Sequence, residues 1–289
     1  MPFVKVEDLN IHYEIEGNGE PLVLLHGMSN NSQSWKEQIQ ELKEHYTVIA
    51  WDAPGYGKSS DPAEEYRNFK EFARILNGML DQLKLEKIHL LGHSMGAAIA
   101  IEYCSLYPNK VNKLILADST RGAAALSPEE NETKLKNRLF SIENLSTKEM
   151  AEKRIQALLS PHASENVHTR VKGIMTQIRP AGYRSVAYSL YHLNQMSMLS
   201  HIVVPVLVIC GELDTVTPIK ESEAIHEKLI NSRLVIIPDG GHLCYQENPR
   251  MFNSSILEFL KDIEWEKTSA NTLVKPGPRL ERGMNRKNG

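Results

Sequence analysis

The stretch at residues 88–103 constrains the fold more than any other part of the chain. A short apolar run stops at Gly92 and an Ala-rich helical pattern begins just after Ser94, so the sequence predicts a buried strand that turns directly into a helix. Gly92 and Gly96 flank the turn because a Cβ at either position would collide with the backbone. Free N–H groups at the helix start point toward the place where negative charge would develop on an attacked carbonyl oxygen. The stretch therefore predicts a nucleophilic serine.

Strand and helix patterns alternate along most of the chain. Residues 3–16 alternate apolar and polar, which predicts a half-exposed antiparallel edge. Solid apolar runs, typical of strands buried on both faces, follow at residues 21–25, 46–51, 88–91, 114–117, 206–210 and 234–237. Helical patterns lie at residues 34–45, 69–83, 95–107, 219–230 and 250–261. This order predicts an α/β fold with a doubly wound, mostly parallel sheet and helices on both faces.

The interval 121–198 breaks the alternation. It has no strand signal, and helical patterns lie around residues 129–140, 147–159, 165–177 and 183–194. Because it leaves the sheet after one strand and returns at the next, we predict a helical cap over the carboxyl ends of the strands, where open α/β sheets bind ligands. The alternative is that these helices only thicken the core. The core is expected at residues 1–120 and 199–263.

Composition limits the partners. The net charge of −3, with both signs mixed, predicts no general attraction to nucleic acid or to an anionic membrane, so we expect a small-molecule substrate. No apolar stretch approaches the roughly 20 residues of a membrane helix. Residues 264–289 lose apolar periodicity and predict a disordered tail, whose basic balance could instead dock a partner.

The three cysteines indicate the compartment. Cys104, Cys210 and Cys244 are widely spaced and lie in apolar surroundings, which predicts buried free thiols rather than disulfides or a metal site. We therefore expect a reducing environment and a cytoplasmic protein. Nothing has the spacing of a dinucleotide loop, and no His-Glu-x-x-His or Cys-x-x-Cys offers metal ligands, so no cofactor and no metal are expected.

A nucleophilic serine needs a base, and the base needs an orienting carboxylate. Among the eleven histidines, His242 follows a buried strand through a short Gly-rich turn, at the sheet edge where Ser94 is predicted. Asp214 lies just past the preceding strand, so the chain order Ser94, Asp214, His242 fits a hydrolase triad. Asp118, at the end of another strand, could reach the same imidazole and stays the alternative acid. Met28 comes just after the first buried strand, and this position predicts that its backbone N–H binds the oxyanion together with that of Met95.

Together these motifs resemble those of the α/β-hydrolase family over residues 3–263. The resemblance is carried by His26-Gly27, the segment Asp52-Ala53-Pro54-Gly55-Tyr56-Gly57-Lys58-Ser59, Gly92-His93-Ser94-Met95-Gly96, Gly211-x-x-Asp214 and Gly241-His242. It implies an eight-stranded sheet with a helical cap. It also implies a cofactor-free serine hydrolase that cleaves an ester or lactone through an acyl-enzyme.

Several branches of the family stay open. Pro180-Ala181-Gly182-Tyr183, followed by the strand at residues 205–211, is similar to the 3-oxoadipate enol-lactonase branch. Those lactonases often carry a different start to the oxyanion loop than His26-Gly27, so general carboxylesterases remain an alternative. Meta-cleavage product hydrolases, which cleave carbon–carbon bonds, resemble the chain in fold and triad. A non-catalytic ligand sensor is the remaining alternative, and a complete triad argues against it.

The cap is expected to set specificity. Side chains near its return to the sheet are predicted to supply part of the pocket wall: Arg179, Tyr183, Tyr188, His192 and Met196. An enol-lactone of the 3-oxoadipate type carries a carboxylate away from the scissile bond and needs a fixed cation at the far end of the cleft. Arg179 and Arg184 are the candidates for that cation. The alternative is that both arginines lie on a solvated cap surface.

Overall fold

The sheet determines where every functional side chain lies. A computed structural model describes residues 2–261 and 272–274, and in it the strands follow the order β1-β2-β4-β3-β5-β6-β7-β8-β9. Strand β2 is antiparallel to β1 and to β4, and all other neighbours are parallel. The strands are β1 (Phe3–Val6), β2 (Leu9–Glu16), β3 (Pro21–Leu25), β4 (Thr47–Trp51), β5 (Ile88–His93), β6 (Val111–Ala117), β7 (Val206–Gly211), β8 (Ser232–Ile237) and β9 (Thr272–Val274).

The predicted strands form, and a short further strand joins them. Strand β9 pairs in parallel with β8, opposite Arg233, Leu234 and Val235. Three residues within a segment that lacks apolar periodicity carry no strand signal, so the sequence did not predict β9. The rest of the segment expected to be a disordered tail lies outside the described residues.

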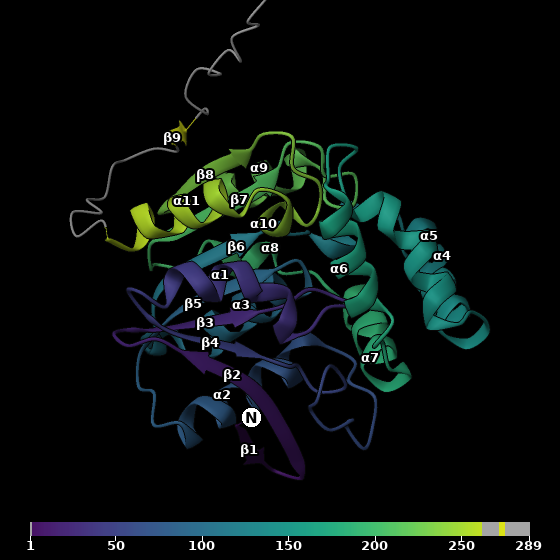
Figure 1. Ribbon diagram of the computed structural model, residues 1–289, viewed down its shortest axis with the longest axis horizontal. Helices are drawn as coiled ribbons and strands as arrows, with labels where there is room; N and C mark the ends of the chain where they lie inside the picture. Colours follow the sequence, from purple (N-terminus) through teal and green to yellow (C-terminus); the bar gives the residue numbers. More distant parts are fainter. Residues whose placement is uncertain (1, 262–271, 275–289) are drawn as a thin grey trace, which may run out of the picture.

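Helices flank both faces of the sheet (Figure 1), as the alternating pattern predicts. Helix α1 packs on α11, and α2 packs on α3. The helices of the core are α1 (Lys36–Leu42), which follows the 3-10 helix η1 (Ser32–Trp35), α2 (Phe69–Gln82), α3 (Met95–Leu106), α9 (Ile219–Lys228), α10 (Cys244–Glu247) and α11 (Pro249–Lys261). The central strands β5 and β7 are buried at every residue, which is why their sequences are mostly apolar, apart from His89 and His93 in β5.

The insertion between β6 and β7 is helical throughout. It contains the 3-10 helix η3 (Gly122–Ala125), α4 (Pro128–Asn144), α5 (Thr147–Leu158), α6 (Glu165–Met175), α7 (Pro180–Tyr191) and α8 (Met196–Leu199). Capping boxes at Ser127 and Ser146 start α4 and α5. In each, the serine hydroxyl accepts the N–H of the glutamate three residues later, and the serine N–H donates to the carboxylate of that glutamate. Helices α4 and α5 stand at one side of the molecule, beyond α6 and α7 (Figure 1).

Helix α4 adds little to the core. Of its 17 residues, Leu135 is the one that is buried. A helix that thickened the core would bury a wide apolar stripe. The polar character of α4 therefore favours a cap over the alternative of a thickened core.

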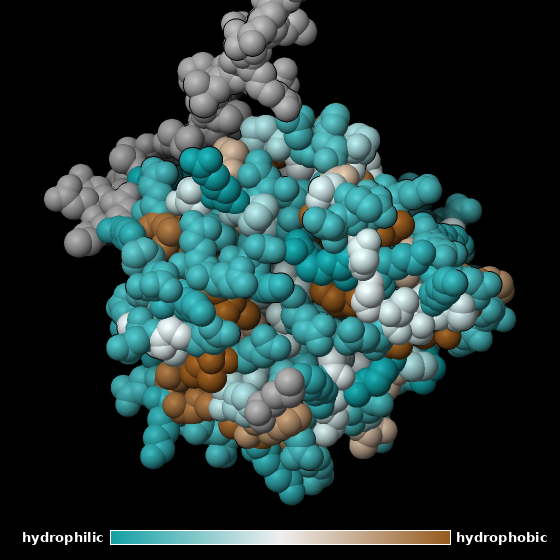
Figure 2. Space-filling model, in the orientation of Figure 1, coloured by the Kyte–Doolittle hydropathy of each residue, from teal (hydrophilic) through white to brown (hydrophobic). Residues whose placement is uncertain are grey.

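Apolar side chains are otherwise gathered inside the molecule. The face seen in Figure 2 is mostly hydrophilic, with apolar side chains in small separate patches. Cys104, Cys210 and Cys244 are buried free thiols, as predicted. Among residues 2–261 and 272–274, no helix has the length and apolar character needed to cross a bilayer.

Candidate active site

Ser94 occupies the turn between β5 and α3. Its backbone has φ 53° and ψ −111°, outside the regions that residues with a Cβ ordinarily adopt, and its N–H donates to the carbonyl oxygen of Ala117 at 2.8 Å. A Cβ on Gly92 would lie 2.2 Å from the carbonyl oxygen of Gly96, and a Cβ on Gly96 would lie 2.1 Å from that of Leu25. The turn therefore requires both glycines, and it holds the serine in a strained conformation.

This strain predicts an effect on stability. We expect Ser94→Gly to unfold with a free energy about 1 kcal/mol higher than Ser94→Ala, because glycine adopts a positive φ without a Cβ clash. Glycine's larger freedom in the unfolded chain offsets part of the gain. Both variants lack the hydroxyl, so denaturant titration of the pair isolates the backbone. Equal or lower stability of the glycine variant would contradict the presence of strain.

The structure brings His242 and Asp214 to the serine. His242, in the turn after β8, lies with Nε2 3.0 Å from Ser94 Oγ, and its Nδ1 lies 2.8 Å from Asp214 Oδ2. Asp214 follows β7, and both β7 and β8 end at the same edge of the sheet as β5. All three groups are joined by hydrogen bonds in one line. An imidazole placed in this way can take a proton from the hydroxyl while the carboxylate holds its other nitrogen.

The surroundings of Asp214 keep it ionised. Burial alone would raise the pKa of Asp214, but the charge of His242 and hydrogen bonds from His242 and Thr217 outweigh burial and lower the pKa below its ordinary value. Its Oδ1 accepts the N–H groups of Val216 at 2.7 Å and Thr217 at 3.0 Å, and its Oδ2 accepts the Thr217 hydroxyl at 2.6 Å. The sequence analysis missed Thr217. The spacing Asp214-x-x-Thr217, a common local side-chain-to-backbone motif, was the available signal.

Asp118 has a different role from Asp214. Its Oδ1 accepts the N–H of Gly211 at 2.9 Å, its Oδ2 lies 3.2 Å from Cys244 Sγ, and no hydrogen bond joins it to His242. Burial and the nearby charge of Asp214 raise the pKa of Asp118 well above its ordinary value. Without a hydrogen bond to His242, Asp118 does not orient the imidazole. Of the two acids weighed from the sequence, Asp214 has the geometry and the charge.

These groups also include the types that bind metals. Asp118, Asp214 and His242 each present a possible ligand atom, and these atoms lie within 4.8 Å of one another. In the structure the same atoms hydrogen-bond to each other, to backbone N–H groups and to the Cys244 thiol. Asp214 and His242 are thus bonded to each other as in a proton relay, while Asp118 is bonded to the Gly211 N–H and the Cys244 thiol.

His93, beside the nucleophile, supports the loop that carries the base. Its Nε2 donates to the carbonyl oxygen of His242 at 2.7 Å, and its ring packs against those of His242 and Tyr245. Burial, followed by the charge of His242, lowers the pKa of His93 to about 3. His93 is therefore neutral near pH 7 and acts as a hydrogen-bond donor to the backbone.

Backbone N–H groups for an oxyanion lie on either side of Ser94. Met95 is the first residue of α3, so its N–H has no acceptor within the helix. Met28 follows β3 in a loop fixed by His26, whose Nδ1 lies 2.9 Å from the Gly27 carbonyl oxygen while its Nε2 accepts the N–H of Ala53 at 3.1 Å. A Cβ on Gly27 would lie 3.4 Å from that of Ser94, so this loop runs directly against the serine.

Comparisons with known proteins agree with this geometry. A family model described as alpha/beta hydrolase fold matches residues 20–249, a span that includes the serine, the aspartate and the histidine. The chain belongs to the α/β-hydrolase fold family. This α/β hydrolase is 30% identical over 286 residues to 2-hydroxy-6-oxononadienedioate/2-hydroxy-6-oxononatrienedioate hydrolase 1 of Pseudomonas putida, with 89% of this chain and 95% of that protein covered.

Solved structures share the fold along nearly the whole chain. A thermophilic esterase from Thermogutta terrifontis, in a malate-bound structure, has a TM-score of 0.82 and 27% identity, with 88% of this chain and 94% of that chain covered. The enol-lactonase from Burkholderia xenovorans LB400 also has a TM-score of 0.82, at 21% identity over 90% of this chain and 99% of that chain, and this likeness is one of fold. The resemblance expected from the sequence motifs is confirmed at the level of the family.

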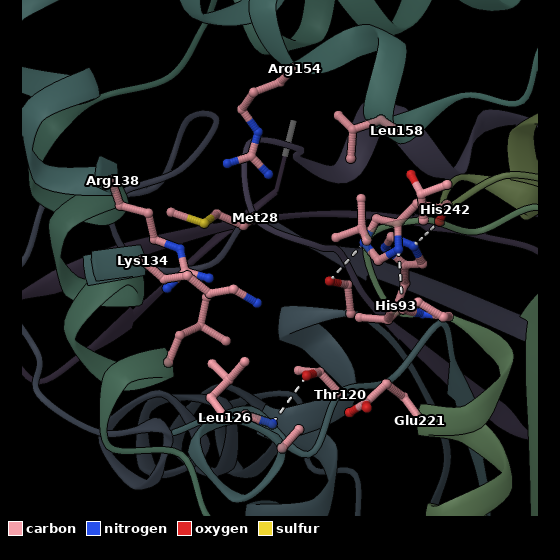
Figure 3. A pocket seen from close by; sticks show the side chains of 18 of the residues that line it. Met28, His93, Thr120, Leu126, Lys134, Arg138, Arg154, Leu158, Glu221 and His242 are labelled. Carbon is pink, nitrogen blue, oxygen red and sulfur yellow. Dashed lines mark hydrogen bonds between the residues drawn. The ribbon is translucent and has the colours of Figure 1, made fainter. Parts of the chain in front are cut away.

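A cavity of about 350 Å³ in this α/β hydrolase opens beside the serine. Ser94 and His242 line it, and Lys134 and Arg138 of the cap helix α4 lie on the side opposite His242 (Figure 3). Apolar side chains of Met28, Leu126 and Leu158 also line it. The cavity suits a small substrate held between sheet and cap.

The cap residues predicted as pocket wall lie elsewhere, so that prediction was wrong. Among the described residues that line the cavity, none of the five appears: Arg179, Tyr183, Tyr188, His192 and Met196. Helix α7 contributes Leu190 to the cavity, and its predicted contact residues face the core and the loop at residues 55–67 instead. Tyr183 is 1% exposed with its hydroxyl 3.3 Å from Arg154 Nη1, and the Tyr188 ring lies 3.7 Å from the Arg67 guanidinium.

The remaining predicted contacts are also structural. Arg179 donates to the carbonyl oxygen of Ser59 at 2.5 Å and pairs with Asp61 at 3.1 Å, and Arg184 pairs with Glu65. These two arginines therefore cannot serve as the cation at the far end of the cleft. His192 packs against the ring of Tyr191, and Met196 packs against the core.

The cations that do line the cavity were missed. On the cap they are Lys134 and Arg138 of α4 and Arg154 of α5, and Lys220 of α9 also lines the cavity, from the core. Lys134 and Arg138 are four residues apart and so share one face of α4. That spacing was a visible signal, but nothing in the sequence decides which face of a polar helix is turned toward the sheet.

Proposed function

We propose that this α/β hydrolase cleaves a small carboxylic ester or lactone through Ser94, His242 and Asp214. The observation that carries the proposal is the line of hydrogen bonds from Ser94 Oγ to His242 Nε2, at 3.0 Å, and from His242 Nδ1 to Asp214 Oδ2, at 2.8 Å. A non-catalytic sensor has no need of a strained serine joined to a base and an ionised acid. The proposal includes the cytoplasmic location expected from the free thiols.

The chemistry follows from these positions. Ser94 Oγ attacks the carbonyl carbon as His242 Nε2 accepts its proton, and Asp214 stabilises the imidazolium through Nδ1–H. The N–H groups of Met28 and Met95 stabilise the oxyanion. His242 then protonates the leaving alcohol or enol oxygen, and an acyl group remains on Ser94. Water, deprotonated by His242, attacks the acyl-enzyme and releases the acid.

Carbon–carbon bond hydrolysis is the second candidate. The observation that favours it is the 30% identity to a hydrolase named for 2-hydroxy-6-oxononadienedioate and 2-hydroxy-6-oxononatrienedioate. Esters and lactones are favoured by the similarity to the Thermogutta terrifontis esterase, at 27% identity. The same serine, base and oxyanion donors can serve either bond, so substrates decide between the candidates.

A comparison of three substrates tests the proposal. If the enzyme cleaves an ester or lactone, turnover of 4-nitrophenyl butyrate or of 3-oxoadipate enol-lactone should exceed turnover of a meta-cleavage dienoate, because His242 then protonates an oxygen leaving group. Rates are measured on the same enzyme preparation, with Ser94→Ala as the background control. Turnover of the dienoate alone would replace the proposal with carbon–carbon hydrolysis. Turnover of none of the three would contradict both.

A further inference from the structure

We propose that Lys134, Arg138 and Arg154 form a carboxylate-binding subsite opposite Ser94. The substrate would then be a small ester or lactone that carries a carboxylate remote from its scissile carbonyl. This inference rests on the proposed function for the position of the carbonyl, but the subsite can be tested by binding alone. We refer to these three residues as the cation cluster.

The cation cluster is directed into the cavity from the cap. In Figure 3, Lys134 and Arg138 extend from α4 on the side opposite His242, and Arg154 extends from α5 into the cavity from above. Two helices thus bring three positive charges to one wall. A substrate whose carbonyl lies at Ser94 would direct its far end toward that wall.

The lining offers the cluster no counter-charge. Glu221 is the acidic residue among the described lining residues, and its two carboxylate oxygens already bond to the Arg121 side chain at 2.7 and 3.2 Å. Glu130, one turn before Lys134, accepts the N–H of Ser127 in the capping box and also interacts with the charge of Lys134 from outside the cavity lining. Among the described residues of the cluster, the cations without a compensating carboxylate are therefore Arg138 and Arg154. Arg154 donates to the neutral hydroxyl of Tyr183 at 3.3 Å, which leaves its charge uncompensated.

Such a grouping is unfavourable in the empty enzyme. Burial, followed by repulsion from Arg154, lowers the pKa of Arg138 to about 10, so its charged form is disfavoured although it persists at neutral pH. An anion entering the cavity would relieve this repulsion. Guanidinium groups bind carboxylates through paired N–H donors, which makes a carboxylate the best fit to Arg138 and Arg154.

The wall between the two ends suits a short hydrocarbon chain. Met28, Leu126 and Leu158 supply apolar side chains to the cavity, with Leu158 near His242 and Met28 beside Arg138 in Figure 3. The cavity therefore has a reactive end and a cationic end, with apolar side chains near each. Monoesters of short dicarboxylic acids, or lactones with a carboxylate side chain, match this order.

Two esters that differ in one terminal group test the subsite. Monoethyl adipate ends in a carboxylate where ethyl hexanoate ends in a methyl group, and pH-stat titration follows both. We expect Arg138→Gln and Arg154→Gln each to lower kcat/KM for monoethyl adipate by about 10- to 100-fold, mainly through KM. Ethyl hexanoate should change by less than about twofold, because it makes no charged hydrogen bond.

The matched control is Lys136→Gln, which removes one charge from α4. Lys136 pairs with Glu132 at 3.3 Å and does not line the cavity. The variant should leave the ratio of the two esters unchanged. If the ratio of kcat/KM for monoethyl adipate to that for ethyl hexanoate fell equally in Arg138→Gln, Arg154→Gln and Lys136→Gln, the effect would be one of general charge and the subsite would be overturned. Arg138→Lys keeps the charge and should restore part of the preference for monoethyl adipate.

Binding of adipate measures the subsite without turnover. Adipate should raise the Tm of the wild type, and Arg138→Gln should need at least about tenfold more adipate for the same rise. This shift in the absence of ester hydrolysis would support the subsite while contradicting the proposed function. The subsite would be overturned, and the proposed function would stand, if Arg138→Gln and Arg154→Gln hydrolysed both esters in the same ratio as the wild type and bound adipate equally well.

Discussion

Ser94→Ala is expected to lower turnover by about 10⁴-fold or more while the protein stays folded. The variant removes the hydroxyl, which lies 3.0 Å from His242 Nε2, and keeps the Cβ and the backbone of the turn. The oxyanion N–H groups of Met28 and Met95 remain, so the residual rate should stay above that of water. Initial rates on the preferred ester or lactone measure the loss, and thermal unfolding monitors the fold.

Ser94→Cys is the matched control for this prediction. It keeps a nucleophile at the same position and should retain a low but measurable acylation, unlike alanine. A Ser94→Ala enzyme with wild-type turnover would contradict the proposed mechanism, because the hydroxyl of Ser94 could then not be the nucleophile.

Asp214→Asn is expected to lower the rate by about 10⁴-fold, and Asp118→Asn far less. Asparagine at position 214 would present its NH₂ group to His242 Nδ1 and favour the tautomer whose Nε2 carries the proton. Such an imidazole cannot accept the proton of Ser94. In the wild type the N–H of Gly211 lies 2.9 Å from Asp118 Oδ1, and the amide oxygen of an asparagine at position 118 can still accept it. An uncharged amide also suits this site, because burial raises the pKa of Asp118.

The two asparagine variants control for each other, since both remove a carboxylate from the same buried region. Their kcat values under one set of conditions decide which acid orients His242. If Asp118→Asn were the more damaging, the acid would have to be assigned to β6, and the 2.8 Å contact of Asp214 would be structural.

Much of the fold was predictable because the strongest signals are local. The apolar runs that became β5 and β7 are buried at every residue, and a parallel strand covered on both faces is mostly apolar, with His89 and His93 as the polar residues of β5. The turn at Ser94 was predictable for a similar reason, since Gly92 and Gly96 leave no room for a Cβ. The positions of Asp214 and His242 followed from the rule that parallel strands end at one edge.

The cap was predictable as helices but not in orientation. The expected contacts Tyr188 and Arg179 bond to the loop that follows β4, because α7 packs between the core and α4. Which face of α4 meets the cavity depends on this packing, and α4 has too few apolar residues for its sequence to reveal it. Arg138 and Arg154 were therefore missed, although a cation at the far end of the cleft was expected.

Covalent labelling of Ser94 is the measurement that tests the central claim most directly. A fluorophosphonate reacts efficiently with a serine when a base activates the hydroxyl and the oxyanion N–H groups donate hydrogen bonds to the phosphoryl oxygen. Mass spectrometry should find one adduct per wild-type chain, on the peptide that contains Ser94, with none on Ser94→Ala and much slower labelling of Asp214→Asn. An unlabelled wild-type protein, or an adduct on a different residue, would contradict the assignment of Ser94 as the nucleophile.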